Sequence, residues 1–213
     1  MCGQRLAPAE AALCTSCHLH LPFTAFEHRP VDNPLARLFW GQLPVERAAA
    51  WFFYEPQAGT GLLIHDLKYH GRPLLAQHLG CIMARQMAAA HFFDGIDALV
   101  PVPLTRRRQW QRGYNQSMEI CRGISQVTGL PIYNKVLRRS RFNASQTTMS
   151  ANQRRTNVEG AFELADAAAV SGRHVLLIDD VITTGATVIA CGQALCEAKD
   201  LQLSVLSLGF THS

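Results

Sequence analysis

Two adjacent carboxylates and a threonine-rich turn form the segment of the sequence with the clearest chemical potential. Asp179 and Asp180 follow four apolar residues, and the run 183–187, rich in Thr and containing Gly185, comes two residues later. Carboxylates accept hydrogen bonds from sugar hydroxyls or help to hold a divalent cation. Hydroxyl side chains, a glycine and the free amides at the start of a helix bind phosphate. Side by side, these groups would suit a ribose 5-phosphate.

A receiver domain and a structural role are the two alternatives for the acidic pair. A response-regulator receiver also carries acids after an apolar strand, but that pair lies near the start of its domain, whereas only about 33 residues follow Asp180. A purely structural pair is disfavoured because unpaired carboxylates are costly to bury. We therefore expect a ligand site at residues 179–187.

Basic residues are concentrated in one segment. Residues 101–155 hold ten Arg and Lys135 against a single acid, Glu119, a net charge of +10 in a chain whose total is +4. The planar guanidinium of Arg suits phosphate oxygens better than the point charge of Lys does. The segment favours a phosphorylated small molecule or a nucleic-acid backbone as partner. The alternative is a solvated Arg-rich surface.

The seven cysteines fall into two groups. Cys2, Cys14 and Cys17 lie close to the N-terminus, and the two-residue gap between Cys14 and Cys17 lets both thiolates face one tetrahedral zinc ion. These two residues would form one zinc knuckle. Cys2 with the glycine after it looks like the second half of another zinc knuckle, whose first half would lie before the first residue. His18 or His20 is the other candidate for a fourth ligand. Unpaired thiols and a redox-active pair are the alternatives. Reduced core residues are expected at the other four positions: Cys81, Cys121, Cys191 and Cys196.

The elements that must position these residues alternate between strand and helix. Strands are expected at 48–54, 97–102, 132–137, 158–164, 174–179 and 203–209, and helices at 62–69, 74–93, 116–128 (capped by Asn115) and 185–199. This alternation predicts an α/β fold with a mainly parallel central sheet flanked by helices. Residues 1–30 are expected to form a small Cys-rich, zinc-knuckle-like module, and residues 31–213 one larger domain.

Composition excludes several classes of protein. With 213 residues, of which 48% are apolar and 17% charged, the chain can bury a core and is not disordered. No apolar run reaches the roughly 18–20 residues that a membrane span needs, and the N-terminus shows no secretory signal. We therefore expect a cytoplasmic protein without a membrane span.

Segment 175–188 resembles the phosphoribosyl pyrophosphate (PRPP) signature of type I phosphoribosyltransferases. Other motifs narrow the resemblance to the ComF/GntX group: Val100-Pro-Val-Pro103, Arg112-Gly-Tyr-Asn-Gln116, Lys68-Tyr-His-Gly71 and the N-terminal cysteines. The resemblance implies the type I phosphoribosyltransferase fold and binding of PRPP with Mg²⁺. It also implies a role in natural DNA uptake, with single-stranded DNA and the proteins of the competence machinery as partners.

The resemblance further implies roles for single residues. Asp179 and Asp180 would bind the ribose 2- and 3-hydroxyls. The loop that follows would wrap the 5-phosphate and comprises Val181, Ile182, Thr183, Thr184, Gly185, Ala186 and Thr187. Pyrophosphate would be bound by the loop after the strand at 97–102, through Pro103, Leu104, Thr105, Arg106 and Arg107. Segment 138–157 would be a mobile flap that closes over the reacting centre and carries Gln146, Arg154 and Arg155.

Several positions keep two interpretations on sequence alone. Arg108 and Arg112 either join the pyrophosphate site or serve as surface charge and helix caps. Lys68 either covers the acceptor side of the site or belongs to a structural turn, and Trp110 is expected to pack rather than to stack on a base. No side chain stands out as a general base. Two functions therefore stay open: a phosphoribosyltransferase with an unknown acceptor, and a non-catalytic PRPP-sensing adaptor that grips single-stranded DNA through the Arg-rich segment.

Overall fold

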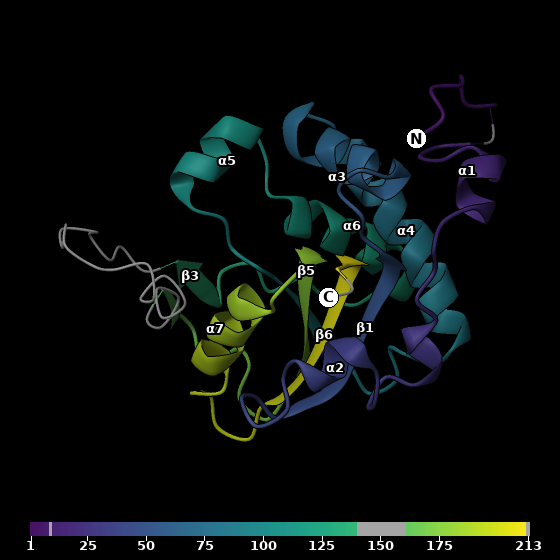
Figure 1. Cartoon of the computed structure of the whole chain (residues 1–213). Helices are drawn as coiled ribbons and strands as arrows, with labels where there is room; N and C mark the ends of the chain where they lie inside the picture. The colour runs from purple at the N-terminus through teal and green to yellow at the C-terminus, as the bar shows by residue number, and fades with distance from the viewer. Residues whose placement is uncertain (9, 140–160, 212–213) are drawn as a thin grey trace, which may run out of the picture.

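The computed structural model describes residues 1–8, 10–139 and 161–211, and a four-stranded sheet lies at its centre (Figure 1). Neighbouring strands are parallel: Val100 pairs with Leu177, and Leu177 pairs in turn with Val205. The mainly parallel sheet flanked by helices that the sequence predicts is confirmed. The strand order is β1 (Val45–Phe53), β6 (Gln202–Phe210), β5 (His174–Ile182) and β2 (Ala98–Pro101).

β1 and β5 contain continuous apolar runs because both faces of the sheet are covered. Residues 175–178 of β5 and 48–52 of β1 have no exposed surface. Parallel strands also need long crossover connections, usually through helices, and these helices cover the faces. Strands such as these therefore lack the alternation of apolar and polar residues seen when one face meets water.

Helices make the crossovers (Figure 1). The helix expected at 74–93 ends earlier, because His91 adopts a left-handed backbone with φ of 58°. The helix expected at 185–199 also ends earlier, at Leu195. After β1 come α3 (Gly59–Tyr69) and α4 (Pro73–Ala89); after β2 come α5 (Arg106–Arg112) and α6 (Gln116–Thr128); α7 (Ala186–Leu195) joins β5 to β6.

Helices α4 and α6 approach closely because glycines face the neighbouring backbone. A Cβ atom on Gly123 would lie 2.0 Å from the carbonyl oxygen of Gln77, and one on Gly80 would lie 2.5 Å from that of Ile120. Only glycine permits this approach. Asn115 caps α6 as expected, since its side chain accepts a hydrogen bond from a backbone amide in the first turn.

A second sheet of two antiparallel strands lies beside α7 (Figure 1). It pairs β3 (Leu137–Arg139) with β4 (Phe162–Leu164). The strand expected at 132–137 is therefore wrong in position. Residues 134–136 form a turn, and Ile132 makes only an isolated bridge to Leu99. The strand expected at 158–164 corresponds, within the described residues, to β4.

The N-terminal residues pack on the same core as the sheet. Helix α1 (Thr15–Leu19), the 3-10 helix η1 (Phe26–His28) and α2 (Pro34–Arg37) precede β1. Leu21 and Trp51 belong to one buried cluster. The division into residues 1–30 and 31–213 stays a prediction. No helix in the described part of the chain has the length and apolar character needed to cross a membrane.

Candidate functional site

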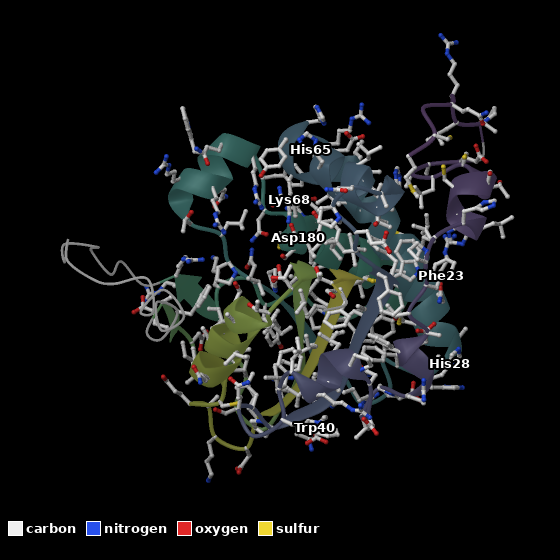
Figure 2. The ribbon with its side chains drawn as sticks, viewed as in Figure 1. Phe23, His28, Trp40, His65, Lys68 and Asp180 are labelled. Atoms are coloured by element: carbon white, nitrogen blue, oxygen red, sulfur yellow. The ribbon has the colours of Figure 1, made fainter. Side chains whose placement is uncertain are left out.

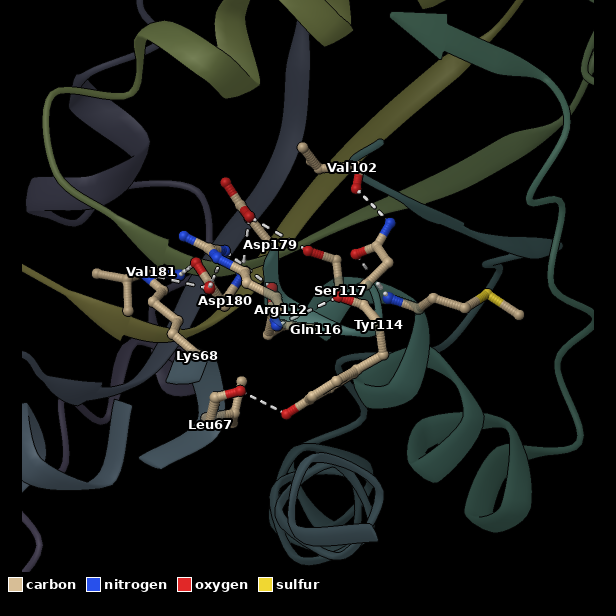
Figure 3. Close-up of polar contacts among 12 residues, drawn as sticks. Leu67, Lys68, Val102, Arg112, Tyr114, Gln116, Ser117, Asp179, Asp180 and Val181 are labelled. Atoms are coloured by element: carbon tan, nitrogen blue, oxygen red, sulfur yellow. Dashed lines mark hydrogen bonds and ion pairs between the residues drawn. The ribbon is translucent and has the colours of Figure 1, made fainter. Parts of the chain in front are cut away.

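Asp179 and Asp180 lie near the carboxyl end of β5, inside a strand that continues to Ile182 and is thus longer than expected. Asp179 Oδ1 accepts hydrogen bonds from the amide of Asp180 at 2.8 Å and from the hydroxyl of Ser117 at 3.3 Å. Asp180 Oδ1 accepts a hydrogen bond from the amide of Val181 at 2.7 Å. Figure 3 shows these contacts. The start of α6 and the end of β5 are therefore joined at the acid pair.

Two cations reach Asp180 from helix ends. Lys68, in the last turn of α3, places Nζ 3.3 Å from Asp180 Oδ2. Arg112, at the end of α5, places a guanidinium nitrogen 4.0 Å from the same oxygen. The end of α3 is itself held in place, because the hydroxyl of Tyr114 donates a hydrogen bond to the carbonyl of Leu67 (Figure 3). Sequence alone had left the roles of Lys68 and Arg112 undecided.

The surroundings of the acid pair make ionisation of Asp179 costly. Burial, and after it the charge of Asp180, raises the pKa of Asp179 to about 7. The hydrogen bonds from the Asp180 amide and Ser117, and the charge of Lys68, lower the pKa but do not cancel this rise. A perturbed carboxyl in a cleft is typical of functional sites. Hydroxyl donors or a cation at this position would favour the carboxylate form.

The carboxylates open into a cavity of about 260 Å³, which we call the acid–arginine cavity. Four cations line it, namely Lys68, Arg108, Arg112 and Arg139, against the two carboxylates. With both acids ionised this lining carries a charge of +2, so the cavity suits a ligand with several negative charges. The other lining residues are Tyr54, Val102, Pro103, Leu104, Ser117, Val181, Thr183 and Thr187.

The threonine-rich turn leads from β5 into α7 beside this cavity. Gly185, with φ of 75°, occupies the cap position of α7 and provides no side-chain hydrogen bond. The first amides of the helix therefore have no side-chain partner at the cap. A small hollow of about 50 Å³ is lined by residues 181–188 and Asp179. Thr183 and Thr187 line this hollow and the acid–arginine cavity alike. The structure brings the predicted diol and phosphate elements together, while their ligands stay predictions.

The predicted pyrophosphate loop is partly a helix. Thr105 accepts a hydrogen bond from the amide of Arg108 at 3.1 Å, and α5 begins at Arg106, inside the segment that was expected to be a loop. The helix forms because Thr is a favourable N-cap and Arg and Gln are good helix formers. It ends at Arg112, and the cap residue that follows, Gly113, has a φ of 77°, which suits a helix C-terminus.

Not all the residues predicted to bind pyrophosphate line the acid–arginine cavity, because some of them lie on α5. Pro103 and Leu104 line the acid–arginine cavity, whereas the side chain of Arg107 is exposed and does not line it. Arg108, one residue further along, does line it. The side chain of Arg106 lies outside what the structure describes.

The predicted flap at 138–157 falls mostly outside the described residues. Gln146, Arg154 and Arg155 are among the residues that the structure does not describe. The described start of the segment contributes Arg139, whose guanidinium lies 4.9 Å from the ring centroid of Phe162. Burial lowers the pKa of Arg139. This residue brings the segment to the edge of the acid–arginine cavity.

Trp110 is exposed. The prediction that its side chain packs in the protein is therefore wrong. The residue is 87% exposed, because α5 stands away from the sheet at one end of the molecule (Figure 1). The indole lies on the same short helix as the exposed Arg107 and Arg108. The helix therefore presents an aromatic ring together with positive charge.

Sequence reasoning missed Ser117 altogether. The signal that could have found it is its place two residues after the Asn115 cap, in the first turn of α6, which follows β2. Helices that follow neighbouring parallel strands begin at the same edge of the sheet. That rule points to the start of α6 but not to the side chain that faces the acids.

The N-terminal cysteines form a cluster. The sulfurs of Cys2, Cys14 and Cys17 lie within 4.8 Å of one another, and those of Cys2 and Cys14 are 3.6 Å apart. Two thiolates bound to one tetrahedral zinc, each about 2.3 Å from the ion, would be about 3.8 Å apart, so the cluster fits zinc. Burial raises the pKa of Cys17 to about 11, so zinc binding would displace its proton.

Neither histidine considered as a fourth ligand belongs to this cluster. His20 Nδ1 forms a 2.7 Å hydrogen bond with the carbonyl oxygen of Ser16. The ring of His18 packs near Phe23 and Trp51, with centroids 5.5 and 6.0 Å away. The thiols line a separate cavity of about 400 Å³ whose other walls include α3 and α4. In the described residues, the cluster therefore offers three ligands.

Comparison with curated proteins decides the family. The sequence is 33% identical over 199 residues to DNA utilization protein YhgH of Escherichia coli O157:H7, covering 90% of this chain and 81% of the relative. It is 41% identical over 130 residues to competence protein F of Haemophilus influenzae, covering 59% of this chain and 57% of the relative. This chain belongs to the ComF family. The family inferred from the motifs is thus confirmed, although no family model matches the sequence.

Solved structures similar to this ComF-family chain include a glutamine PRPP amidotransferase from Bacillus subtilis in complex with ADP and GMP. The TM-score is 0.46 and the identity 22%, over 67% of this chain and 30% of the amidotransferase. The fold of the ComF-family chain is assigned from its strand order and from the parallel pairing of its strands.

Proposed function

We propose that this ComF-family chain binds PRPP with Mg²⁺ in the acid–arginine cavity and acts in the use of imported DNA. One observation carries the proposal. The carboxylates of Asp179 and Asp180, four cationic side chains and the uncapped start of α7 meet at the carboxyl edge of the parallel sheet. Ligands of open parallel sheets bind at this edge.

Each part of PRPP has a matching group in the site. The ribose 2- and 3-hydroxyls would donate hydrogen bonds to Asp179 and Asp180. The 5-phosphate would accept hydrogen bonds from the amides at the start of α7, and the diphosphate would face Arg108 and Arg112. The two acids are also the residues that would hold Mg²⁺, directly or through the ribose hydroxyls. When bound, Mg²⁺ neutralises part of the charge on the departing diphosphate.

Transfer and sensing are the two activities that such a site supports. In transfer, the bond from ribose C1 to the diphosphate oxygen breaks and its electron pair leaves with the diphosphate. A nitrogen of the acceptor forms a bond to C1 and loses its proton. Among the described residues that line the cavity, we assign none as the base for that proton. The groups present therefore support binding more directly than turnover.

Calorimetric titration of the protein with PRPP tests the proposal. We expect saturable binding that weakens when Mg²⁺ is removed by chelation. Release of pyrophosphate from PRPP in the presence of a panel of nitrogenous bases would identify an enzyme, and binding without release would identify a sensor. Absence of heat at millimolar PRPP with Mg²⁺ present would contradict the proposed function.

Exposure of Trp110 favours a second function, binding of single-stranded DNA. An exposed indole on a basic helix offers the two contacts that single strands use, which are stacking on bases and pairing with phosphates. Arg107 lies beside it with its side chain in solvent, outside the acid–arginine cavity. The nucleic acid would therefore lie along α5, next to the PRPP site rather than inside it.

Substituting Trp110 by Ala is expected to weaken binding of an oligothymidine by about 5- to 150-fold, since stacking contributes about 1–3 kcal/mol per base. Fluorescence anisotropy of a labelled oligonucleotide measures the affinity, which should also fall linearly in log salt. Trp40→Ala is the matched control, because Trp40 is 59% exposed and lies beside Arg37. Figure 2 shows Trp40 at the end of the molecule far from Lys68 and Asp180. Equal losses in the two variants would contradict a specific role for Trp110.

We also propose that Cys2, Cys14 and Cys17 bind one zinc ion, which supplies a structural link between the N-terminal segment and α1. The 3.6 Å separation of two of the sulfurs supports this proposal. Zinc would connect Cys2 to the two cysteines of α1 and its cap, and structural zinc contributes directly to folding.

Metal analysis of the purified protein should find about one zinc per chain, and Cys14→Ser should remove it. Cys196→Ser is the control, because Cys196 is a half-buried free thiol outside the cluster. Loss of zinc should also lower the melting temperature in Cys14→Ser but not in Cys196→Ser. Wild-type protein without zinc after purification in zinc-supplemented medium would contradict the proposal.

A further inference from the structure

Both oxygens of the Asp180 carboxylate already have partners. Oδ1 accepts a hydrogen bond from the backbone amide of Val181 at 2.7 Å, and Oδ2 pairs with Lys68 Nζ at 3.3 Å. The amide is part of β5 and cannot move away. Lys68 has a flexible four-carbon stem. Arg112 also approaches Oδ2, at 4.0 Å, so a ribose hydroxyl that binds Asp180 at this oxygen competes with two cations, of which Lys68 is the nearer.

Arg112 is held more firmly than Lys68. It donates a 2.8 Å hydrogen bond to Gln116 Oε1, and its guanidinium lies 5.8 Å from the ring centroid of Tyr69. Lys68, by contrast, has Asp180 as its one ion-pair partner within the described part of the chain. Figure 3 shows the two cations approaching Asp180 together. Lys68 is thus the cation that can exchange its partner.

The position of Lys68 makes that exchange selective. Its side chain is 21% exposed and lines the acid–arginine cavity, so Nζ can turn from Asp180 into the cavity without leaving the site. A partly buried ammonium that loses its carboxylate is destabilised unless another anion takes its place. A diphosphate in the cavity would provide that anion, whereas a ligand with a 5-phosphate alone would not.

We propose, building on the proposed PRPP site, that Lys68 is an exchangeable counter-ion that selects for a diphosphate at ribose C1. Lys68 pairs with Asp180 until the sugar diphosphate enters, and then it binds an oxygen of the diphosphate. Asp180 Oδ2 is thereby released to a ribose hydroxyl. Each charge keeps a partner throughout, and a ribose phosphate without the diphosphate leaves Lys68 unpaired.

Calorimetry with two ligands, PRPP and ribose 5-phosphate, tests this inference. Lys68→Met should weaken PRPP binding by roughly 10- to 100-fold, the value of a charge-assisted hydrogen bond. Binding of ribose 5-phosphate should stay the same or become tighter, because Asp180 is no longer occupied. Lys68→Arg keeps the charge and should retain most of the PRPP affinity. Lys199→Met is the matched control, because Lys199 is 87% exposed and does not line the acid–arginine cavity.

The outcomes separate this inference from the proposed function. Suppose that Lys68→Met binds PRPP as wild type does, or that it loses affinity for both ligands equally. The proposal that Lys68 changes its partner from Asp180 to the diphosphate is then wrong, and the proposed PRPP site is unaffected. If wild-type protein binds neither ligand, the proposed function fails and the exchange fails with it. Retained binding of ribose 5-phosphate by Lys68→Met also shows that the variant is folded.

Discussion

Replacing Asp179 and Asp180 together by Asn is expected to lower the affinity for PRPP by more than about 100-fold, since each hydrogen bond to a charged group contributes about 1.5–3 kcal/mol. The ribose hydroxyls would lose two ionised acceptors, and Mg²⁺ would lose the carboxylates that hold it. Asn has nearly the same size, so the shape of the cavity is kept. Calorimetric titration with PRPP and Mg²⁺ measures the loss.

Asp200→Asn is the control for this double substitution. Asp200 is an exposed acid that lies outside the acid–arginine cavity, and its loss changes the net charge without touching the site. We expect wild-type affinity for PRPP in this variant. Unchanged affinity in the double variant would show that PRPP binds elsewhere and would remove the assigned site.

Asp179→Asn alone is expected to make the protein more stable at neutral and alkaline pH. Burial and the charge of Asp180 raise the pKa of Asp179 to about 7 in the folded protein, whereas an unfolded Asp has a pKa of about 3.9. Between these values the folded state binds more protons than the unfolded state, so the stability of the wild type falls as pH rises. Above pH 7 the full penalty is present, on the order of a few kcal/mol.

Thermal melts from pH 4 to pH 8 check this prediction. The melting temperatures of wild type and Asp179→Asn should nearly coincide at pH 4 and separate as the pH rises, with the variant higher. Asp200→Asn should show no such separation, since its side chain is 75% exposed. A variant that melts below wild type at pH 8 would contradict the prediction. Asp179→Asn should also bind PRPP poorly, because it lacks the carboxylate that would accept a hydrogen bond from a ribose hydroxyl. The carboxylate would thus lower stability and support ligand binding.

Local patterns in the sequence were sufficient to predict most of the helices and strands. The apolar run before Asp179 predicts β5, and the cap at Asn115 predicts the start of α6, because both depend on neighbours along the chain. The threonine-rich turn with Gly185 predicts the start of α7 for the same reason, and phosphate binding at that turn stays a prediction. Predictions were wrong where local signals are ambiguous. The strand expected at 132–137 begins only at Leu137, and part of the loop expected after residue 102 is the helix α5.

By itself, then, the sequence determined the α/β fold, the ComF family and the acid pair with its adjoining turn. Only the tertiary structure decided which cations face Asp180. Lys68 and Arg112 come from two different helices, and α3 and β5 are separated by more than a hundred residues. Their contact depends on the packing of helix ends at one edge of the sheet, which no spacing along the chain encodes. The same holds for Trp110, which is exposed because α5 extends away from the sheet instead of packing against it.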